Sequence, residues 1–199
     1  MLSVYIVGMR IPFLGVCVAH AALAGAVFGS LAGLTGPALL GAALVAAMIA
    51  SLALGLADPQ RLNADTNALM GLLFSATMGL AFIGMGLFPM LGRSDNDVRS
   101  LLWGSLNFCR WEDVGLMLAA FAALAAFVGL FGKEMRAIMF SRQDATAAGI
   151  HATFVWTGFL VLTAVVMAVN FQTVGGLMIY SLISNPALAT TCSKLFVRS

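Results

Sequence analysis

The feature that most constrains this sequence is a long stretch without a charged side chain. No Asp, Glu, Lys or Arg occurs between Arg10 and Asp58. A single helix over that stretch would be about 70 Å long, roughly twice the thickness of a bilayer's hydrocarbon core. The Thr35-Gly36-Pro37 sequence provides a break, because proline favours the first turn of a helix and disfavours helix in the residue before it. We therefore expect two membrane-spanning helices in this stretch.

The composition extends this interpretation to the whole chain. Of the 199 residues, 61% are hydrophobic and only 9% are charged, whereas soluble domains are about a quarter charged. The mean hydropathy is +1.01. We predict an all-α fold, a polytopic transmembrane helical bundle that forms a single domain over residues 1–199. The uncharged runs predict about six spans, at 13–34, 37–57, 68–91, 113–132, 152–170 and 174–191.

The placement of the cations predicts the orientation of the bundle. The net charge of +2 is too small to indicate a nucleic-acid partner. With an even number of spans both termini share one side, and most of the Lys and Arg residues fall on that side, which the positive-inside rule assigns to the cytoplasm. The cations on this side are Arg10, Arg61, Lys133, Arg136, Arg142, Lys194 and Arg198, against Arg93, Arg99 and Arg110 on the other.

Two series of small residues indicate close packing between helices. Small side chains at four-residue spacing lie on one helix face and let two backbones approach closely within a bilayer. The series are Gly25, Gly29 and Gly33 in the first span, and Gly71, Ser75 and Gly79 in the third. We interpret both as packing surfaces rather than as sites of chemistry.

His20 is the ionisable side chain inside the first span. An ionisable group in a membrane-spanning helix is costly, so a functional role is the first hypothesis to consider. The alternative is a hydrogen-bonded structural role. The residues alone leave both open.

The longest inner loop is predicted at about 133–151. Asp144-Ala-Thr-Ala-Ala favours a short helix, and Gly149 is suited to end it. Such a segment could contact a soluble partner or simply connect two spans. Gly132-Lys133 is followed by Glu134 rather than by Ser or Thr, so there is no phosphate-binding loop and nucleotide chemistry must belong to another chain.

Four stretches together resemble the membrane permease subunits of bacterial ABC importers for zinc, manganese or iron(II). They are residues 10–21, 65–75, 101–113 and 144–149, the last continued by 174–187. The resemblance implies that the chain moves a divalent transition metal into the cytoplasm and is not itself an enzyme. It implies a cytoplasmic ABC ATPase that hydrolyses ATP, an extracytoplasmic metal-binding protein and a second permease copy in a homodimer. It also implies a multi-pass location in the bacterial inner membrane, surrounded by lipid, with no cofactor bound by this chain.

The resemblance assigns roles to particular residues. The segment Gln143 to Gly149 is similar to the family's coupling helix, so Gln143, Asp144, Ala148 and Gly149 are expected to contact the ATPase. In the family an Asp stands four residues before the histidine, on the same helix face, and both are thought to line the metal's path.

This sequence departs from that pattern, because Val16 occupies the position of the Asp. His20 is then the expected metal ligand. Cys17 is a possible second one, whose thiolate would favour zinc over manganese. The alternative for Cys17 is a small buried hydrophobic residue.

A second departure concerns length. The family has a helix before Arg10 and further helices after Pro186, so we expect this sequence to lack flanking helices at both ends.

Two rival functions remain open. One is an importer of the same architecture for another small solute, such as a metal chelate. The other is a non-transporting or degenerate membrane subunit, favoured by Val16 and the missing helices. A membrane-embedded enzyme is a third and weaker alternative, because the chain has only two histidines, His20 and His151.

Overall fold

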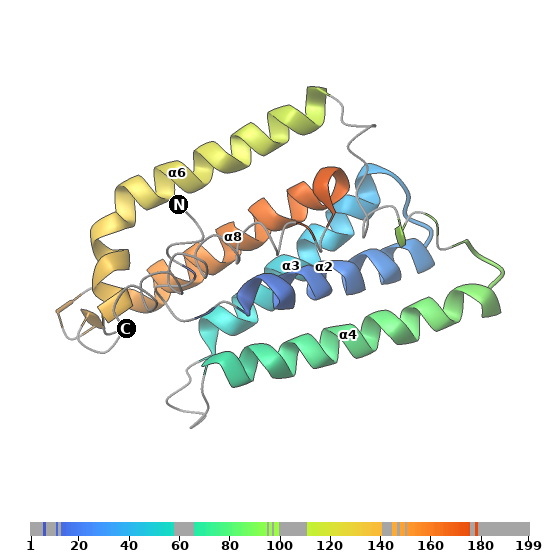
Figure 1. Ribbon diagram of the computed structural model, residues 1–199, viewed down its shortest axis with the longest axis horizontal. Helices are drawn as coiled ribbons and strands as arrows, with labels where there is room; N and C mark the ends of the chain where they lie inside the picture. The colour runs from blue at the N-terminus through green and yellow to red at the C-terminus, as the bar shows by residue number, and fades with distance from the viewer. Residues whose placement is uncertain are drawn as a thin grey trace, which may run out of the picture.

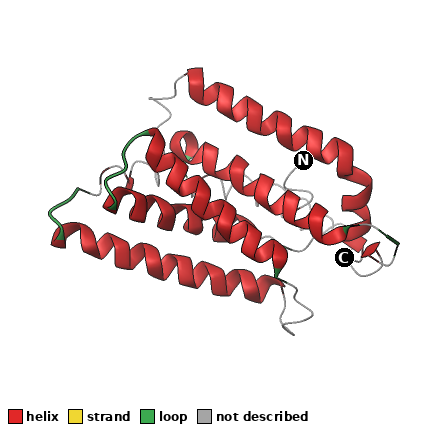
Figure 2. Cartoon of the chain, turned by 180° about the vertical axis from the view of Figure 1, so that it is seen from behind, coloured by secondary structure: helices red, strands yellow, loops and turns green. Residues whose placement is uncertain are grey.

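The computed structural model consists of five long helices that lie side by side (Figures 1 and 2). They are α2 (Leu14–Leu31), α3 (Pro37–Leu56), α4 (Thr66–Met90), α6 (Trp111–Phe140) and α8 (Ala152–Val174). The structure describes residues 6, 11, 13–57, 66–94, 96, 98, 99, 111–140, 145, 146, 148, 149, 151–175 and 178, without the side chains of 112 and 171–173. No β-strand occurs among these residues, so the predicted all-α fold is confirmed.

The main contacts join the helices in the order α4, α2, α3, α8 and α6. Helices that follow one another in the sequence run in opposite directions through the bundle (Figure 1). The main buried cluster takes its side chains chiefly from α2, α3 and α8, and α4 and α6 lie on the two outer sides of the row. Many large apolar side chains of the outer helices are exposed, such as Leu72 and Phe82 on α4 and Phe121 and Leu130 on α6, as expected of surfaces that face lipid.

Five of the predicted spans correspond to helices that are long and apolar enough to cross a bilayer. For α2, α3 and α4 the predicted ends agree with the structure to within about three residues, the usual uncertainty of helix boundaries. Pro37 stands at the start of α3 directly after Gly36, which has φ +57°, so the predicted break is confirmed. The sixth predicted span, 174–191, lies almost wholly outside the described residues.

Helix α6 is longer than the sequence predicts. It continues past residue 132 to Phe140 across a kink at Phe131, where φ is −104° and ψ is 15°. Residues 133–140, which were expected to begin the inner loop, are therefore helical. The charges of Lys133, Glu134 and Arg136 end the apolar run without ending the helix, because beyond the kink Met135 and Ile138 still pack into the main cluster.

The first series of small residues packs as predicted at two of its three positions. A Cβ atom on Gly25 would overlap Ala46 Cβ and come within 2.6 Å of the Ala42 carbonyl oxygen of α3. A Cβ atom on Gly29 would lie 2.8 Å from Ala42 Cβ. The backbones of α2 and α3 can approach this closely only because both positions lack a side chain.

The remaining small residues behave differently from the prediction. Gly33 lies beyond the end of α2 with φ +89°, so it ends the helix instead of packing against a neighbour. A Cβ atom on Gly71 or Gly79 would meet no atom of the described residues within 4 Å, so none of these residues packs closely against that face of α4. The contact of α4 with α2 is made instead at Gly84, where an added Cβ would overlap Val27.

Helices α2 and α4 end in the same way and are joined at their ends. In α2 the amide of Gly33 donates to Ser30 and that of Leu34 to Gly29, and in α4 the amides of Gly92 and Arg93 make the equivalent bonds. This is the Schellman arrangement, with glycine in the left-handed conformation. The Arg93 guanidinium also donates to the carbonyl oxygens of Ser30 at 3.2 Å and Leu31 at 2.8 Å. It thus links the two helix ends and places a positive charge at the negative end of the α2 dipole.

We expect Gly25→Leu to destabilise the bundle by about 1–3 kcal/mol or more, because the new side chain would separate α2 from α3. The measurement is thermal unfolding of the purified protein in detergent. Gly41→Leu in α3 is the matched control, because a Cβ there meets nothing within 4 Å. Equal melting temperatures for the two variants would contradict the close approach.

We expect Arg93→Gln to lower the stability of the bundle by about 1 kcal/mol, because two carbonyl groups of α2 lose a charged donor. Arg93→Lys keeps a charged donor but lacks the guanidinium Nη1 from which both bonds come, so its melting temperature should fall between those of Arg93→Gln and the unmodified chain. The expectation fails if Arg93→Gln unfolds at the same temperature as the unmodified chain.

Candidate functional site

His20 is half-buried on α2, on the side that meets α4. Its Nδ1 atom lies 2.9 Å from the carbonyl oxygen of Val16, one turn earlier in the same helix. A carbonyl oxygen can only accept a hydrogen bond, so Nδ1 carries the proton when the ring is neutral and Nε2 keeps a free lone pair. Histidines that ligate metals commonly donate their other ring N–H to a backbone carbonyl in this way.

Phe74 of α4 fixes the other side of the His20 ring. The two ring centroids are 4.7 Å apart and the ring planes meet at 78°, an edge-to-face arrangement. Phe74 also makes an edge-to-face contact with Phe13, at 5.6 Å and 85°. The imidazole is therefore oriented by its own helix through a hydrogen bond and by the neighbouring helix through an aromatic contact.

Sequence reasoning missed Phe74, because nothing in the spacing of residues indicates which ring of another helix will face His20. It also missed two fully buried hydroxyl groups, Ser51 of α3 and Thr163 of α8, which have no hydrogen-bond partner among the residues that the structure describes. Buried hydroxyl groups usually have such a partner. No regularity of the sequence distinguishes these two from other Ser and Thr residues.

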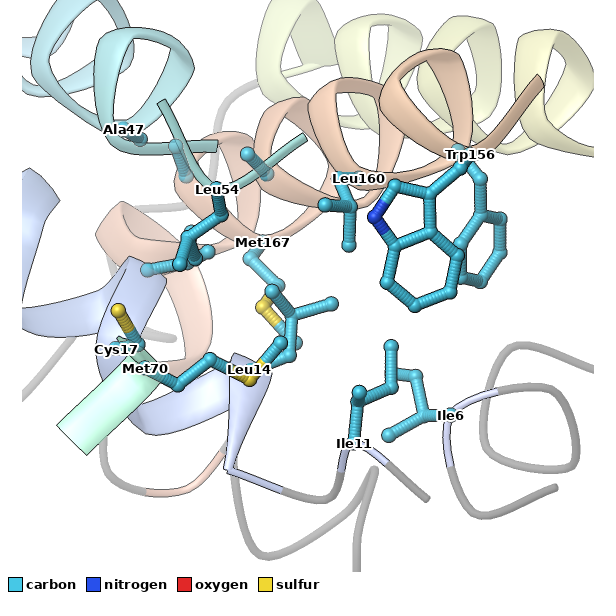
Figure 3. Close-up of a cluster of buried hydrophobic side chains, with 14 of the residues drawn as sticks. Ile6, Ile11, Leu14, Cys17, Ala47, Leu54, Met70, Trp156, Leu160 and Met167 are labelled. Carbon is cyan, nitrogen blue, oxygen red and sulfur yellow. The ribbon is translucent and has the colours of Figure 1, made fainter. Parts of the chain in front are cut away.

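Cys17 has different surroundings from His20 although it is only three residues away. It is fully buried in the main hydrophobic cluster, together with Leu54 and Met70 (Figure 3). This environment fits the alternative of a small buried hydrophobic residue. A role for Cys17 as a metal ligand stays a prediction.

The described residues contain no group of three or more His, Cys, Asp or Glu side chains that could hold a metal ion. His20 offers one nitrogen donor, whereas transition metals take four or more ligands. A metal ion at His20 would need further ligands from water, from a second chain or from residues outside the described part.

The predicted coupling segment is described only in part. Gln143 and Asp144 lie outside the described residues, and Ala148 and Gly149 are exposed. Gly149 has φ +82° and its amide donates to the Thr146 carbonyl at 3.0 Å, so it ends a helical turn as the sequence predicts. Ala145 is buried in the main cluster and anchors this turn to the bundle.

A bundle of apolar helices held by glycine contacts, with an oriented imidazole between two of its helices, defines a multi-pass membrane protein. Comparison with known proteins gives the family. Residues 1–197 match the ABC 3 transport family, and the chain belongs to it. It is therefore a member of a family of transporter membrane subunits, not an enzyme.

Two relatives illustrate the similarity. The chain is 26% identical over 198 residues to a "Probable iron transport system membrane protein" of Haemophilus influenzae, which covers 98% of this chain and 70% of that protein. It also resembles the solved structure of "PsaBC from Streptococcus pneumoniae in complex with Fab", with a TM-score of 0.70 and 21% identity. That match covers 93% of this chain and 64% of the solved chain, so this chain spans less than two thirds of its length and shares its fold.

We expect ¹⁵N NMR of histidine-labelled protein to find the neutral His20 ring protonated at Nδ1, because Val16 offers only an acceptor. His151→Gln leaves a single histidine signal, since the chain has two. Phe74→Ala is the companion variant, in which the ring should show broader signals because one of its two contacts is lost. A ring protonated at Nε2 would contradict this geometry.

Proposed function

We propose that this chain is the membrane-spanning permease subunit of an ABC importer that moves a divalent transition metal into the cytoplasm. Zinc, manganese and iron are the candidate ions. Membership of the ABC 3 transport family supports a transport role. The name of the Haemophilus influenzae relative refers to iron transport and supports a metal ion as the cargo.

The observation that carries the proposal is the oriented His20 ring. The Val16 carbonyl holds Nδ1, which leaves the Nε2 lone pair for a metal ion. Imidazole is a good ligand for zinc and for iron. One nitrogen donor binds a metal ion weakly enough for it to leave again, which suits passage through a pathway more than storage.

The residue at position 16 also affects which metal ions would bind at His20. The family's carboxylate is replaced by a valine side chain at this position, so the site has lost a negative charge and an oxygen ligand. The valine still orients the histidine through its main chain. We propose that His20 keeps its role in the pathway and that the loss of the carboxylate weakens binding of harder ions such as manganese more than binding of zinc.

The energy for transport would come from other chains. The segment 143–149 would be the contact with a cytoplasmic ABC ATPase, and the exposed Ala148 and Gly149 would form part of that contact. An extracytoplasmic metal-binding protein would deliver the ion, and a second copy of the permease would form the other half of the pathway. The second copy, water or residues outside the described part would supply the further metal ligands.

The proposed orientation follows the positive-inside rule. Lys133 and Arg136 lie near the end of α6 that leads to the 143–149 segment, and Arg93 lies at the opposite end of the bundle. We place the 143–149 segment and both termini in the cytoplasm, and the protein in the inner membrane. The rival functions are import of another small solute, such as a metal chelate, and a subunit that does not transport.

The test is uptake of Zn²⁺, Mn²⁺ and Fe²⁺ into proteoliposomes that contain the permease with its ATPase. We expect uptake and metal-stimulated ATP hydrolysis, and a loss of about tenfold or more in His20→Gln, the lower range for removing a group that supports metal binding. Thr77→Val is the matched control. It removes the side-chain hydrogen bonds that Thr77 donates to the carbonyl oxygens of Leu73 and Phe74 in α4, but no metal ligand.

Each rival predicts a different result. A chelate importer would respond to the chelate and not to the free ions. A non-transporting subunit would show no uptake with any cargo. Normal metal uptake by His20→Gln would remove His20 from the pathway while leaving the transport function intact.

A further inference from the structure

Helix α6 consists of two arms that meet at Phe131. The backbone of Phe131 has φ −104° and ψ 15°, outside the helical range, and the residues on both sides of it are helical. We name residues 111–130 the long arm and residues 132–140 the short arm. The bend between them lies near one end of α6 (Figure 1). Helix α6 is thus two helical segments joined at one residue rather than one continuous rod.

Two glycines explain why the helix bends at this point. Sharp bends usually occur at proline, at Gly/Ser pairs or where something interrupts the hydrogen bonds of the helix. Helix α6 contains no proline, and Gly129 and Gly132 stand on either side of Phe131. Glycine has the lowest helix propensity of any residue except proline. A Cβ atom on either glycine would meet no described atom within 4 Å, so both weaken the helix here without serving a close contact.

The two arms are held by the bundle to different degrees. In the short arm, Met135 and Ile138 are buried in the main cluster. Among the described side chains of the long arm only Ala120 and Leu124 are buried, and neither belongs to a buried cluster. Segments with few buried apolar contacts are the first to move in a folded protein. The short arm is therefore fixed to the bundle, and the long arm is held much less firmly.

The firmest contact of the long arm lies one turn before the bend. The rings of Phe127 and Phe131 have centroids 4.9 Å apart and planes tilted by 38°. Phe127 also lies against Gly158 of α8, where an added Cβ atom would be 3.2 Å from ring atom Cε2. A ring that rests on glycine meets no side chain that would stop it from turning. The long arm can therefore pivot on this contact while the main cluster stays intact.

We propose that Phe131 is a hinge about which the long arm swings while the short arm stays packed on the bundle. About 20 residues separate Trp111 from Phe131, so the long arm is about 30 Å long at about 1.5 Å per residue. A change of about 10° in the bend moves the Trp111 end by about 5 Å over that length. Ala145 is buried in the same cluster as the short arm, so the turn that follows α6 stays with the bundle.

The hinge gives α6 a role in transport, and this role rests on the proposed function. The segment 143–149, the proposed contact with the ATPase, follows the short arm in the sequence. The hinge thus separates that contact from the end of α6 at the opposite side of the membrane. The long arm changes its position there while the short arm keeps its place beside the ATPase. The hinge itself does not depend on the cargo.

The first experiment measures distances between spin labels by pulsed electron paramagnetic resonance, on the full chain in lipid nanodiscs with its three native cysteines replaced by alanine. The outer pair is Leu116→Cys on the long arm with Ala38→Cys at the start of α3, and the inner pair is Phe140→Cys with Leu56→Cys. All four positions are exposed. We expect the distance distribution of the outer pair to be broader than that of the inner pair by about 5 Å, the swing of the long arm.

Alanine at the two glycines tests whether the bend causes this breadth. Gly129→Ala combined with Gly132→Ala favours a continuous helix, and both new methyl groups have room. Gly115→Ala is the matched control, because it lies in the same helix far from the bend and its Cβ also meets nothing within 4 Å. We expect the double variant to narrow the outer distribution to the width of the inner one, and the control to leave it unchanged. Equal widths for the two pairs in the unmodified chain, or no narrowing in the double variant, would overturn the hinge.

The second experiment measures metal uptake and ATP hydrolysis in proteoliposomes that contain the chain with its ATPase. We expect the double variant to bind the ATPase as the unmodified chain does and to lose uptake about tenfold, in line with the combined helix preference of two Gly to Ala substitutions. Unchanged uptake in a double variant with a narrowed distribution would remove the hinge from transport. Absence of uptake in the unmodified chain would contradict the proposed function, whereas the spin-label distances decide the hinge in either case.

Discussion

The close approach of α2 and α3 at Gly25 determines how the rest of the bundle is arranged. In lipid there is little hydrophobic force between helices, so association depends on packing, hydrogen bonds and the fit of surfaces. Gly25 and Gly29 bring α2 against α3, and Val27 on another face of α2 fits against Gly84 of α4. His20 lies about one and a half turns from Gly25 on the same helix, so these contacts also set the position of its ring.

The fold was largely predictable because a bilayer restricts a chain so strongly. Backbone groups in lipid must bond within a helix, so uncharged runs of sufficient length identify the spans. The prediction differs from the structure where local sequence and packing disagree. Charged residues at 133–136 suggested the end of a span, yet α6 continues to Phe140, because the burial of Met135 and Ile138 stabilises the helix beyond the kink at Phe131.

The small residues also show that a sequence pattern does not by itself determine the packing. The spacing of Gly25 and Gly29 correctly predicts a packing surface, but the equal spacing of Gly71, Ser75 and Gly79 does not show whether a partner helix is present. Spacing alone identifies a face on which close approach is possible. Only the arrangement of the neighbouring helices decides whether it occurs, as the contact at Gly84 illustrates.

The candidate site was predictable only in part. An ionisable residue in an apolar helix is conspicuous, so His20 could be found from the sequence. Its orientation could not, since the Val16 carbonyl and the Phe74 ring act through main-chain geometry and through contact between helices. The same limit applies to Cys17, whose burial among apolar side chains depends on α3 and α4 as much as on α2.

The hydrogen bond between His20 and Val16 is confined to one helix, and this has a mechanical consequence. If α2 rotates or slides as a rigid body, the imidazole moves with it and keeps its proton on Nδ1. Phe74 belongs to α4, so it keeps its contact with the ring only as far as α4 moves together with α2. A shift of α4 relative to α2 would therefore leave the proton of the ring on Nδ1 and change only the contact at the edge of the ring.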